Sequence, residues 1–214
     1  MQGQWRQERE PGSPARNMAA DEAVFEAVRR GEMNVPVVRV YQWDRTSVSF
    51  GRLQDEDAVR EAYPHLPVIR RPTGGLAVEH GNDITVSVIT RQEWLPGQET
   101  RGVLSSYRQI VAGLLEAFHE SGVPASLGGA GDVRERGAVD CFASLAACDV
   151  ADRLTGRKVM GSAQRRQDGA ILQQMSVPLS ALPDPALFLM QAQYGLRRAM
   201  GLEEWLLIDT PKPV

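Results

Sequence analysis

The sequence predicts an α+β fold, a single domain with a mixed, largely antiparallel sheet flanked by helices. Strand-like segments rich in β-branched residues and segments with a helical apolar stripe follow one another without strict βαβ alternation. The chain has 214 residues, of which 43% are hydrophobic and 24% charged, which is the composition of an ordinary globular domain. Length and composition therefore allow one sizeable hydrophobic core.

The N-terminal region is expected to begin with a flexible segment and a helix. Residues 1–15 are polar and contain two prolines, so we expect them to be loose. Residues 17–30 show a helical pattern, with Asn17 as a candidate N-cap and Gly31 as a candidate stop. The apolar face of this helix carries Met18, Phe25 and Val28. Asp21 shares that face, and we interpret it as a satisfied carboxylate at the boundary of the core.

The remaining elements follow in order along the chain. The expected strands are residues 36–43, 47–50, 68–70, 76–80, 84–90, 123–127, 142–150, 157–163 and 170–179. The expected helices are residues 55–62, 100–121 and 184–200. Short turns predict that 36–43 pairs with 47–50 and that 76–80 pairs with 84–90. We place the domain at residues 16–205 and a C-terminal tail at 206–214.

Charge and cysteine content exclude several classes of protein. The formal net charge of −3 indicates no general affinity for nucleic acid or for an anionic membrane. No apolar run reaches the roughly 18–20 residues that span a bilayer, and the polar start does not resemble a secretory signal. Two cysteines in 214 residues do not make a disulfide framework. We therefore expect a soluble protein of the reducing cytoplasm.

A glycine-containing loop follows the strand at 68–70. It reads Arg70-Arg71-Pro72-Thr73-Gly74-Gly75. Glycines let a backbone approach a ligand closely, and an arginine fork matches a carboxylate or a phosphate, so the loop indicates a site for an acidic group. A surface turn with two solvated arginines is the competing interpretation.

Two further segments carry reactive residue types. Lys158 starts a strand pattern that continues into the small residues Gly161-Ser162-Ala163, and a lysine there can donate to an acyl carbonyl or favour a thiolate nearby. A hairpin between 142–150 and 157–163 would bring Cys141 toward Lys158. The competing interpretations are a solvated lysine and an inert core cysteine. Three histidines and two cysteines are too widely spread to predict a metal site.

In combination these segments resemble a known family. The similarity covers roughly residues 17–200. It is carried by Asn17-Met18-Ala19-Ala20-Asp21-Glu22, by Arg39-Val40-Tyr41-Gln42-Trp43, by Ser47-Val48-Ser49-Phe50-Gly51-Arg52-Leu53-Gln54, by Arg70 to His80, by Asp140-Cys141-Phe142, by Gly156-Arg157-Lys158 with Gly161-Ser162-Ala163-Gln164, and by Ile171-Leu172-Gln173-Gln174. The chain resembles the lipoate–protein ligase A and octanoyltransferase family, which is related to the biotin protein ligases.

The resemblance implies an acyl-transfer site. Residues of the two motifs would line the acyl or acyl-adenylate site: Arg70, Arg71, Thr73, Gly74, Gly75, Ala77, His80, Gly161, Ser162 and Ala163. Lys158 would contact the acyl carbonyl. In the branch with a Cys-Phe motif, Cys141 would accept octanoyl from acyl carrier protein as a thioester. The acyl group would then pass to a lysine of a lipoyl domain, such as the glycine-cleavage H protein or the E2 subunit of a 2-oxoacid dehydrogenase.

Two other functions stay open. In the ligase branch, ATP and Mg²⁺ activate free lipoate as an adenylate, and no cysteine is needed. Cys141-Phe142 and the pair of glycines favour the transferase, which needs no cofactor. The transferase pattern usually has His-Gly-Ser where this chain has Gln174-Met175-Ser176. We expect Gln174 and Met175 near the acyl pocket, and this departure motivates a third function, a non-catalytic protein that binds acyl groups or lipoyl domains. The family default is a monomer, and the preference for octanoyl or lipoyl stays open.

Overall fold

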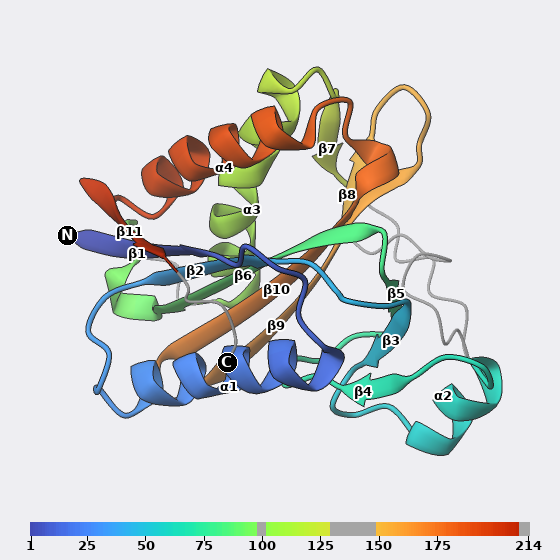
Figure 1. Ribbon diagram of the computed structural model, residues 1–214. Helices are drawn as coiled ribbons and strands as arrows, with labels where there is room; N and C mark the ends of the chain where they lie inside the picture. The colour runs from blue at the N-terminus through green and yellow to red at the C-terminus, as the bar shows by residue number, and fades with distance from the viewer. Residues whose placement is uncertain (98–101, 129–148, 210–214) are drawn as a thin grey trace.

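The computed structural model describes residues 1–97, 102–128 and 149–209 (Figure 1). Its helices are α1 (Pro14–Arg29), α2 (Glu56–Ala62), α3 (Val103–Glu120) and α4 (Pro185–Ala199), with short 3-10 turns at Gln92–Trp94 and Leu179–Ala181. Its strands are β1 (Gln2–Gln7), β2 (Val37–Tyr41), β3 (Ser47–Phe50), β4 (Val68–Arg70), β5 (Val78–His80), β6 (Asp83–Arg91), β7 (Ala125–Leu127), β8 (Val150–Asp152), β9 (Lys158–Gln167), β10 (Ala170–Pro178) and β11 (Glu204–Asp209).

The described strands form two sheets. The large sheet has the order β11-β1-β2-β6-β10-β9-β8-β7, and the small sheet has the order β4-β3-β5. In the large sheet, β1 pairs in parallel with β11 and with β2, whereas the pairs from β2 to β7 are antiparallel. The predicted α+β class with a mixed, largely antiparallel sheet is confirmed.

Helices cover both faces of the large sheet. Figure 1 shows α3 and α4 on one face and α1 on the other. Val38, Val86 and Val88 belong to the main core with α3 and α4, whereas Val37 and Ile89 pack with α1. This alternation is the period of two expected when a strand is covered on both sides. In the described ranges, no helix is long and apolar enough to cross a membrane.

The expectation of a loose N-terminal segment is wrong. Residues 2–7, expected to be flexible, form β1, and its Trp5 is 2% exposed in the main core. The C-terminal tail also begins as a strand, because β11 pairs with β1 over residues 204–209. Composition misses these strands because parallel pairing satisfies their backbone groups whatever the side chains are. The sheet therefore extends beyond the predicted 16–205 limits at both ends.

Both predicted N-terminal hairpins are also wrong. Strands β2 and β3 lie in different sheets, as do β5 and β6. Strand β6 instead pairs with β2 and β10, and β5 pairs with β3. Eight consecutive residues of β6 are buried, so this strand occupies the middle of the large sheet, between helices on both faces. The short turns after β2 and β5 therefore carry the chain from one sheet to the other and back.

Most other predicted elements are confirmed within a few residues. Helices α2, α3 and α4 appear where expected, although Ser13 rather than Asn17 caps α1. Strands β9 and β10 form a hairpin whose loop, Asp168-Gly169, has φ of 50° and 80°. Two consecutive positive φ values are typical of the tight turn that matches strand twist. Of the predicted strand 142–150, residues 142–148 lie outside the described residues.

Candidate functional site

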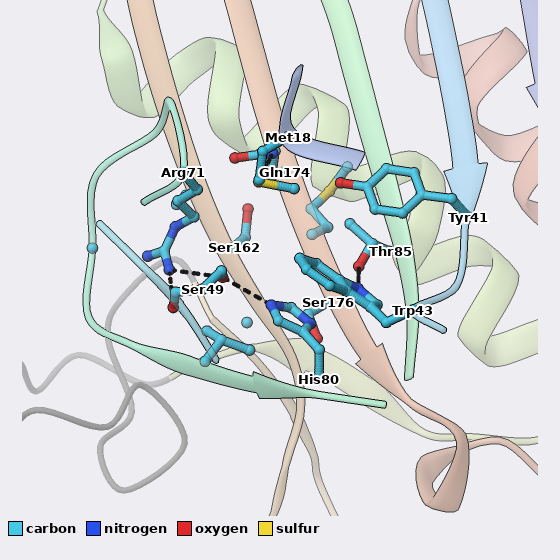
Figure 2. A pocket seen from close by; sticks show the side chains of 15 residues that line it. Met18, Tyr41, Trp43, Ser49, Arg71, His80, Thr85, Ser162, Gln174 and Ser176 are labelled. Carbon is cyan, nitrogen blue, oxygen red and sulfur yellow. Dashed lines mark hydrogen bonds between the residues drawn. The ribbon is translucent and has the colours of Figure 1, made fainter. Parts of the chain in front are cut away.

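A pocket lies where the small sheet faces the large one, and Figure 2 shows its walls. Its described lining consists of Met18, Tyr41, Trp43, Ser49, Arg71, Gly75, Val78, His80, Thr85, Gly161, Ser162, Ala163, Gln174, Met175 and Ser176. Apolar and aromatic side chains such as Met18, Trp43 and Met175 share this lining with about as many polar ones. That mixture suits a ligand with an apolar body and one polar end.

Adjacent strands supply one wall of this pocket. In the β9–β10 hairpin, Gly161, Ser162 and Ala163 pair with Ser176, Met175 and Gln174, respectively. The small residues of β9 leave room that larger side chains would fill. The expected placement of Gln174 and Met175 beside the pocket is confirmed.

Arg71 shapes the opposite wall. Its side chain is 5% exposed, and its guanidinium donates to the carbonyls of Ser49 (2.9 Å), Gly74 (2.5 Å) and Leu76 (2.7 Å). These bonds hold the 70–77 loop against β3. Arg70 points elsewhere: it is exposed and donates to the carbonyls of Arg52 and Gln54. Both guanidinium groups thus donate to backbone carbonyls of the chain itself. Recognition of an acidic ligand group by Arg70 and Arg71 stays a prediction.

Gly51 allows the loop to lie this close to β3. A Cβ added at Gly51 would be 2.1 Å from the carbonyl oxygen of Gly75, a distance that no side chain tolerates. Gly75 itself has φ of +85°, which favours glycine. Gly51 directly follows a predicted strand, so its position was visible in the sequence, but its contact with a loop 24 residues away was not.

A buried carboxylate connects α1, the large sheet and the loop. Asp21 is 0% exposed and is therefore fully buried rather than at the boundary predicted for it. It accepts hydrogen bonds from Arg39, from the Tyr41 hydroxyl (2.8 Å), from Ser87 Oγ (2.6 Å) and from Gln174 Nε2 (2.7 Å). Gln174 Oε1 in turn accepts from Thr73 Oγ1 at 2.6 Å. Gln174 thus bridges the helix carboxylate to the glycine loop.

This environment also fixes the protonation of Tyr41. Burial, and next the negative charge of Asp21, raise the pKa of Tyr41 well above its ordinary value. The phenol therefore stays neutral and donates to Asp21 at any physiological pH.

A second cluster of hydrogen-bonded polar side chains, Ser49, His80 and Asp83, lies at the edge of the pocket. Ser49 Oγ is 2.8 Å from His80 Nε2, and His80 Nδ1 is 2.8 Å from Asp83 Oδ2. The indole of Trp43 stacks on the imidazole, with ring centroids 3.9 Å apart and planes inclined by 12°. Burial would raise the pKa of Asp83, but the charge of His80 and hydrogen bonds from His80, Ser176 and the Gly81 N–H outweigh burial and lower it.

Lys158 begins β9, three residues before the first pocket residue on that strand. Its Nζ is 2.7 Å from Asp149 Oδ2, and both side chains are 5% exposed. The ion pair places a buried ammonium group at the end of the sheet next to the pocket. The predicted nucleophile Cys141 and its neighbour Phe142 lie outside the described residues.

The structure brings together part of the predicted site. Six of the predicted residues line the pocket: Arg71, Gly75, His80, Gly161, Ser162 and Ala163. Five others do not line it: Arg70, Thr73, Gly74, Ala77 and Lys158. Thr73 and Ala77 are buried members of the loop: Thr73 donates to Gln174, and Ala77 packs against Val48 and Phe50 of β3. The catalytic and binding roles of all these residues stay predictions.

Sequence reasoning missed Trp43, Ser49 and Asp83 as members of the site. Trp43 and Ser49 stand in segments that carried the family resemblance, which was the signal available. Asp83 falls in the short turn predicted between 76–80 and 84–90, where nothing in the sequence marked it as a site residue. Among the residues that the structure describes, no group of three or more His, Cys, Asp or Glu side chains could hold a metal ion.

Comparisons with known proteins identify relatives of this chain. The chain is 42% identical over 192 residues to octanoyltransferase LipM of Symbiobacterium thermophilum, and 38% identical over 191 residues to the same-named protein of an Exiguobacterium species. Each match covers 84% of this chain and 66% of the relative. The chain thus spans just under two thirds of the length of these relatives.

The fold is that of a solved putative lipoate protein ligase from T. acidophilum with bound lipoic acid. The two structures superpose with a TM-score of 0.73 at 20% identity, over 99% of this chain and 91% of the other. Residues 13–187 match the family model described as lipoyl protein ligase A/B catalytic domain. With most of its length matched, the chain belongs to the lipoyl protein ligase A/B catalytic domain family.

Proposed function

We propose that this protein is an octanoyltransferase of protein lipoylation. It takes an octanoyl group from acyl carrier protein and delivers it to a lysine of a lipoyl domain. The observation that carries the proposal is the pairing of the glycine loop with Gly161–Ala163 around one apolar pocket, in a chain 42% identical to a protein named octanoyltransferase.

The pocket suits a medium-length acyl chain. Met18, Trp43 and Met175 provide an apolar wall, and Arg71 with Gly75 closes the opposite side. Each methylene transferred from water into such surroundings contributes about 0.8 kcal/mol, so an eight-carbon chain is distinguishable from a short one.

The reaction consists of two acyl transfers through Cys141. The Cys141 thiolate attacks the thioester of the carrier, and the carrier leaves as a thiolate while the acyl group becomes a cysteine thioester. The neutral amine of the acceptor lysine then attacks that thioester, which yields an amide and restores the cysteine. The ammonium of Lys158, held by Asp149, stabilises the negative charge that develops on the acyl oxygen in both steps.

A transfer assay tests the proposal. Octanoyl–acyl carrier protein and an unmodified lipoyl domain, from a glycine-cleavage H protein or a 2-oxoacid dehydrogenase E2, are mixed with the protein in the absence of ATP. We expect the lipoyl domain to gain one octanoyl group by mass. Cys141→Ser should abolish the gain, and Cys148→Ser, which removes the other cysteine, should retain it.

Two outcomes would contradict the proposal. Modification of the domain only with free lipoate, ATP and Mg²⁺, at equal rates in both cysteine variants, would assign the chain to the ligases. No modification under either condition would leave it a binding protein.

A further inference from the structure

Ser49, His80 and Asp83 form a chain of hydrogen bonds that the two-step transfer leaves unused. The three residues come from β3, β5 and the start of β6, and they are 2%, 5% and 4% exposed. Distances of 2.8 Å join Ser49 Oγ to His80 Nε2 and His80 Nδ1 to Asp83 Oδ2. This is the geometry in which a hydroxyl, a base and a carboxylate that orients the base act as a unit.

The surrounding groups fix the direction of each proton. Asp83 accepts from Ser176 Oγ at 2.7 Å and from the Gly81 N–H at 3.1 Å, and these donors turn its carboxylate so that Oδ2 accepts the His80 Nδ1 proton. That tautomer leaves a lone pair on Nε2. Arg71 Nη1 donates to Ser49 Oγ at 3.2 Å, so the single hydroxyl proton of Ser49 points to His80.

The imidazole ring of His80 is held in place by its neighbours in the pocket. Trp43 stacks on His80, and its own Nε1 donates to Thr85 Oγ1 at 3.0 Å (Figure 2). Both Ser49 and His80 line the pocket. In the described residues, the charged groups facing His80 are Asp83 directly and Arg71 across Ser49.

Strand register places Asp83, to which His80 is hydrogen-bonded, at the end of the large sheet where Lys158 begins β9. Ser176 of β10 pairs with Gly161 on one side and Thr85 on the other, and Pro178 pairs with Asp83. Lys158 precedes Gly161 on β9, so Lys158 and Asp83 lie at the same end of the sheet. Under the proposed function, Lys158 contacts the acyl carbonyl, and the carbonyl therefore lies at this end too.

The second acyl transfer needs a base at that end. A lysine side chain has an ordinary pKa of about 10.4, so the acceptor arrives at pH 7 as an ammonium without a lone pair. Lys158 is an ammonium paired with Asp149, and an ammonium group only donates. Another group has to take the proton before the amine attacks.

We propose that Ser49, His80 and Asp83 are a proton relay that deprotonates the acceptor lysine, an inference that rests on the thioester route proposed above. The ammonium gives one proton to Ser49 Oγ while the hydroxyl proton of Ser49 moves to His80 Nε2. The neutral amine attacks the thioester, loses its second proton to the departing Cys141 sulfur, and becomes an amide. The imidazolium of His80, stabilised by Asp83, later returns its proton to water. Asp83 acts through His80 and is a positioning residue.

Single-turnover measurements test the relay. The protein is loaded with octanoyl from octanoyl–acyl carrier protein, freed of the carrier, and mixed either with a lipoyl domain or with hydroxylamine, an amine that is already neutral at pH 7. The variants are His80→Gln, which keeps a hydrogen-bonding side chain but no base, and Asp83→Asn. His65→Gln, the same change at an exposed histidine, is the matched control.

We expect His80→Gln to slow transfer to the lipoyl domain by about 10²-fold at pH 7, the usual contribution of a general base. The deficit should shrink toward about pH 9, because the acceptor amine then loses its proton without help. Asp83→Asn should show the same pattern more weakly, and reaction with hydroxylamine should match the wild-type rate in both variants.

Three results would overturn the inference. An equal deficit with hydroxylamine and with the lipoyl domain would show that His80 only holds the pocket together. A wild-type transfer rate in His80→Gln would show that the relay is idle. Octanoyl recovered as an ester on Ser49 would make Ser49 a nucleophile. If the wild-type protein takes up no octanoyl at all, the thioester route itself fails, and the relay proposal fails with it.

Discussion

Replacing Gln174 by leucine should destabilise the protein and loosen the glycine loop together. Gln174 is 6% exposed and is the bridge between Asp21 Oδ2, at 2.7 Å, and Thr73 Oγ1, at 2.6 Å. Leucine is similar in size but makes neither hydrogen bond. The substitution therefore removes the bridge and keeps most of the packing.

The magnitude follows from the two broken bonds. A hydrogen bond to a charged group contributes about 1.5–3 kcal/mol, and the lower end applies because Asp21 keeps Arg39, Tyr41 and Ser87 as donors. The Thr73 hydroxyl, 0% exposed, loses its acceptor, which costs about 1–3 kcal/mol. We expect a total loss of about 3 kcal/mol in the free energy of unfolding, or about 6–12 °C in Tm for a domain of this size.

Urea and thermal unfolding of Gln174→Leu, beside wild type, give the measurement. Gln167→Leu, the same change at an exposed position at the far end of β9, is the control and should stay within about 0.5 kcal/mol. Gln174→His, which restores the residue of the usual transferase pattern and can still hydrogen bond, should lose less than the leucine variant. An unchanged Tm in Gln174→Leu would refute the bridging role assigned to this side chain.

Two further changes probe the loop and the relay. Gly51→Ala should lower Tm and octanoyl uptake because the added Cβ would collide with the Gly75 carbonyl. The control is Gly74→Ala, which should leave Tm unchanged because no atom lies within 4 Å of its added Cβ. Equal Tm values in the two variants would contradict the predicted collision. Because the pKa of Asp83 is lowered from 3.8, its carboxylate stabilises the fold above that pH, and the contribution is lost as pH falls below 3.8 through the folded-state pKa. In Asp83→Asn, the free energy of unfolding should therefore fall less steeply as the pH is lowered through this range. A pH dependence identical to that of the wild-type protein would contradict the stabilising role of the Asp83 carboxylate.

Local patterns in the sequence predicted most elements of this fold but not their pairing. The helical pattern over 100–121 and the two adjacent strand patterns at 157–163 and 170–179 are local signals, and helix α3 and the β9–β10 hairpin appear there. Strand partners are a long-range property. The turns after β2 and β5 look like hairpin turns, yet the chain crosses between sheets there because β6 is buried in the middle of the large sheet. Strands β1 and β11, at one end of the large sheet, were not predicted because their parallel pairing satisfies their backbone groups whatever the side chains are.

The sequence likewise predicted many residues of the candidate site but not the contacts that they make. The motifs that carried the family resemblance contain Arg71, His80 and Ser162, and the structure brings all three to one pocket. The sequence could not show that the Arg71 guanidinium donates its hydrogen bonds to carbonyls of its own loop, because the positions of those carbonyls depend on how the loop folds. Nor could it show that Asp83, in an ordinary turn motif, would orient His80.

The most direct test of the account is intact-mass spectrometry of the protein after mixing with octanoyl–acyl carrier protein, with neither ATP nor acceptor present. The account predicts a gain of one octanoyl group that hydroxylamine removes, that peptide analysis locates on Cys141, and that Cys141→Ser does not acquire. A protein whose mass stays unchanged, or that carries the group on another residue, would contradict it.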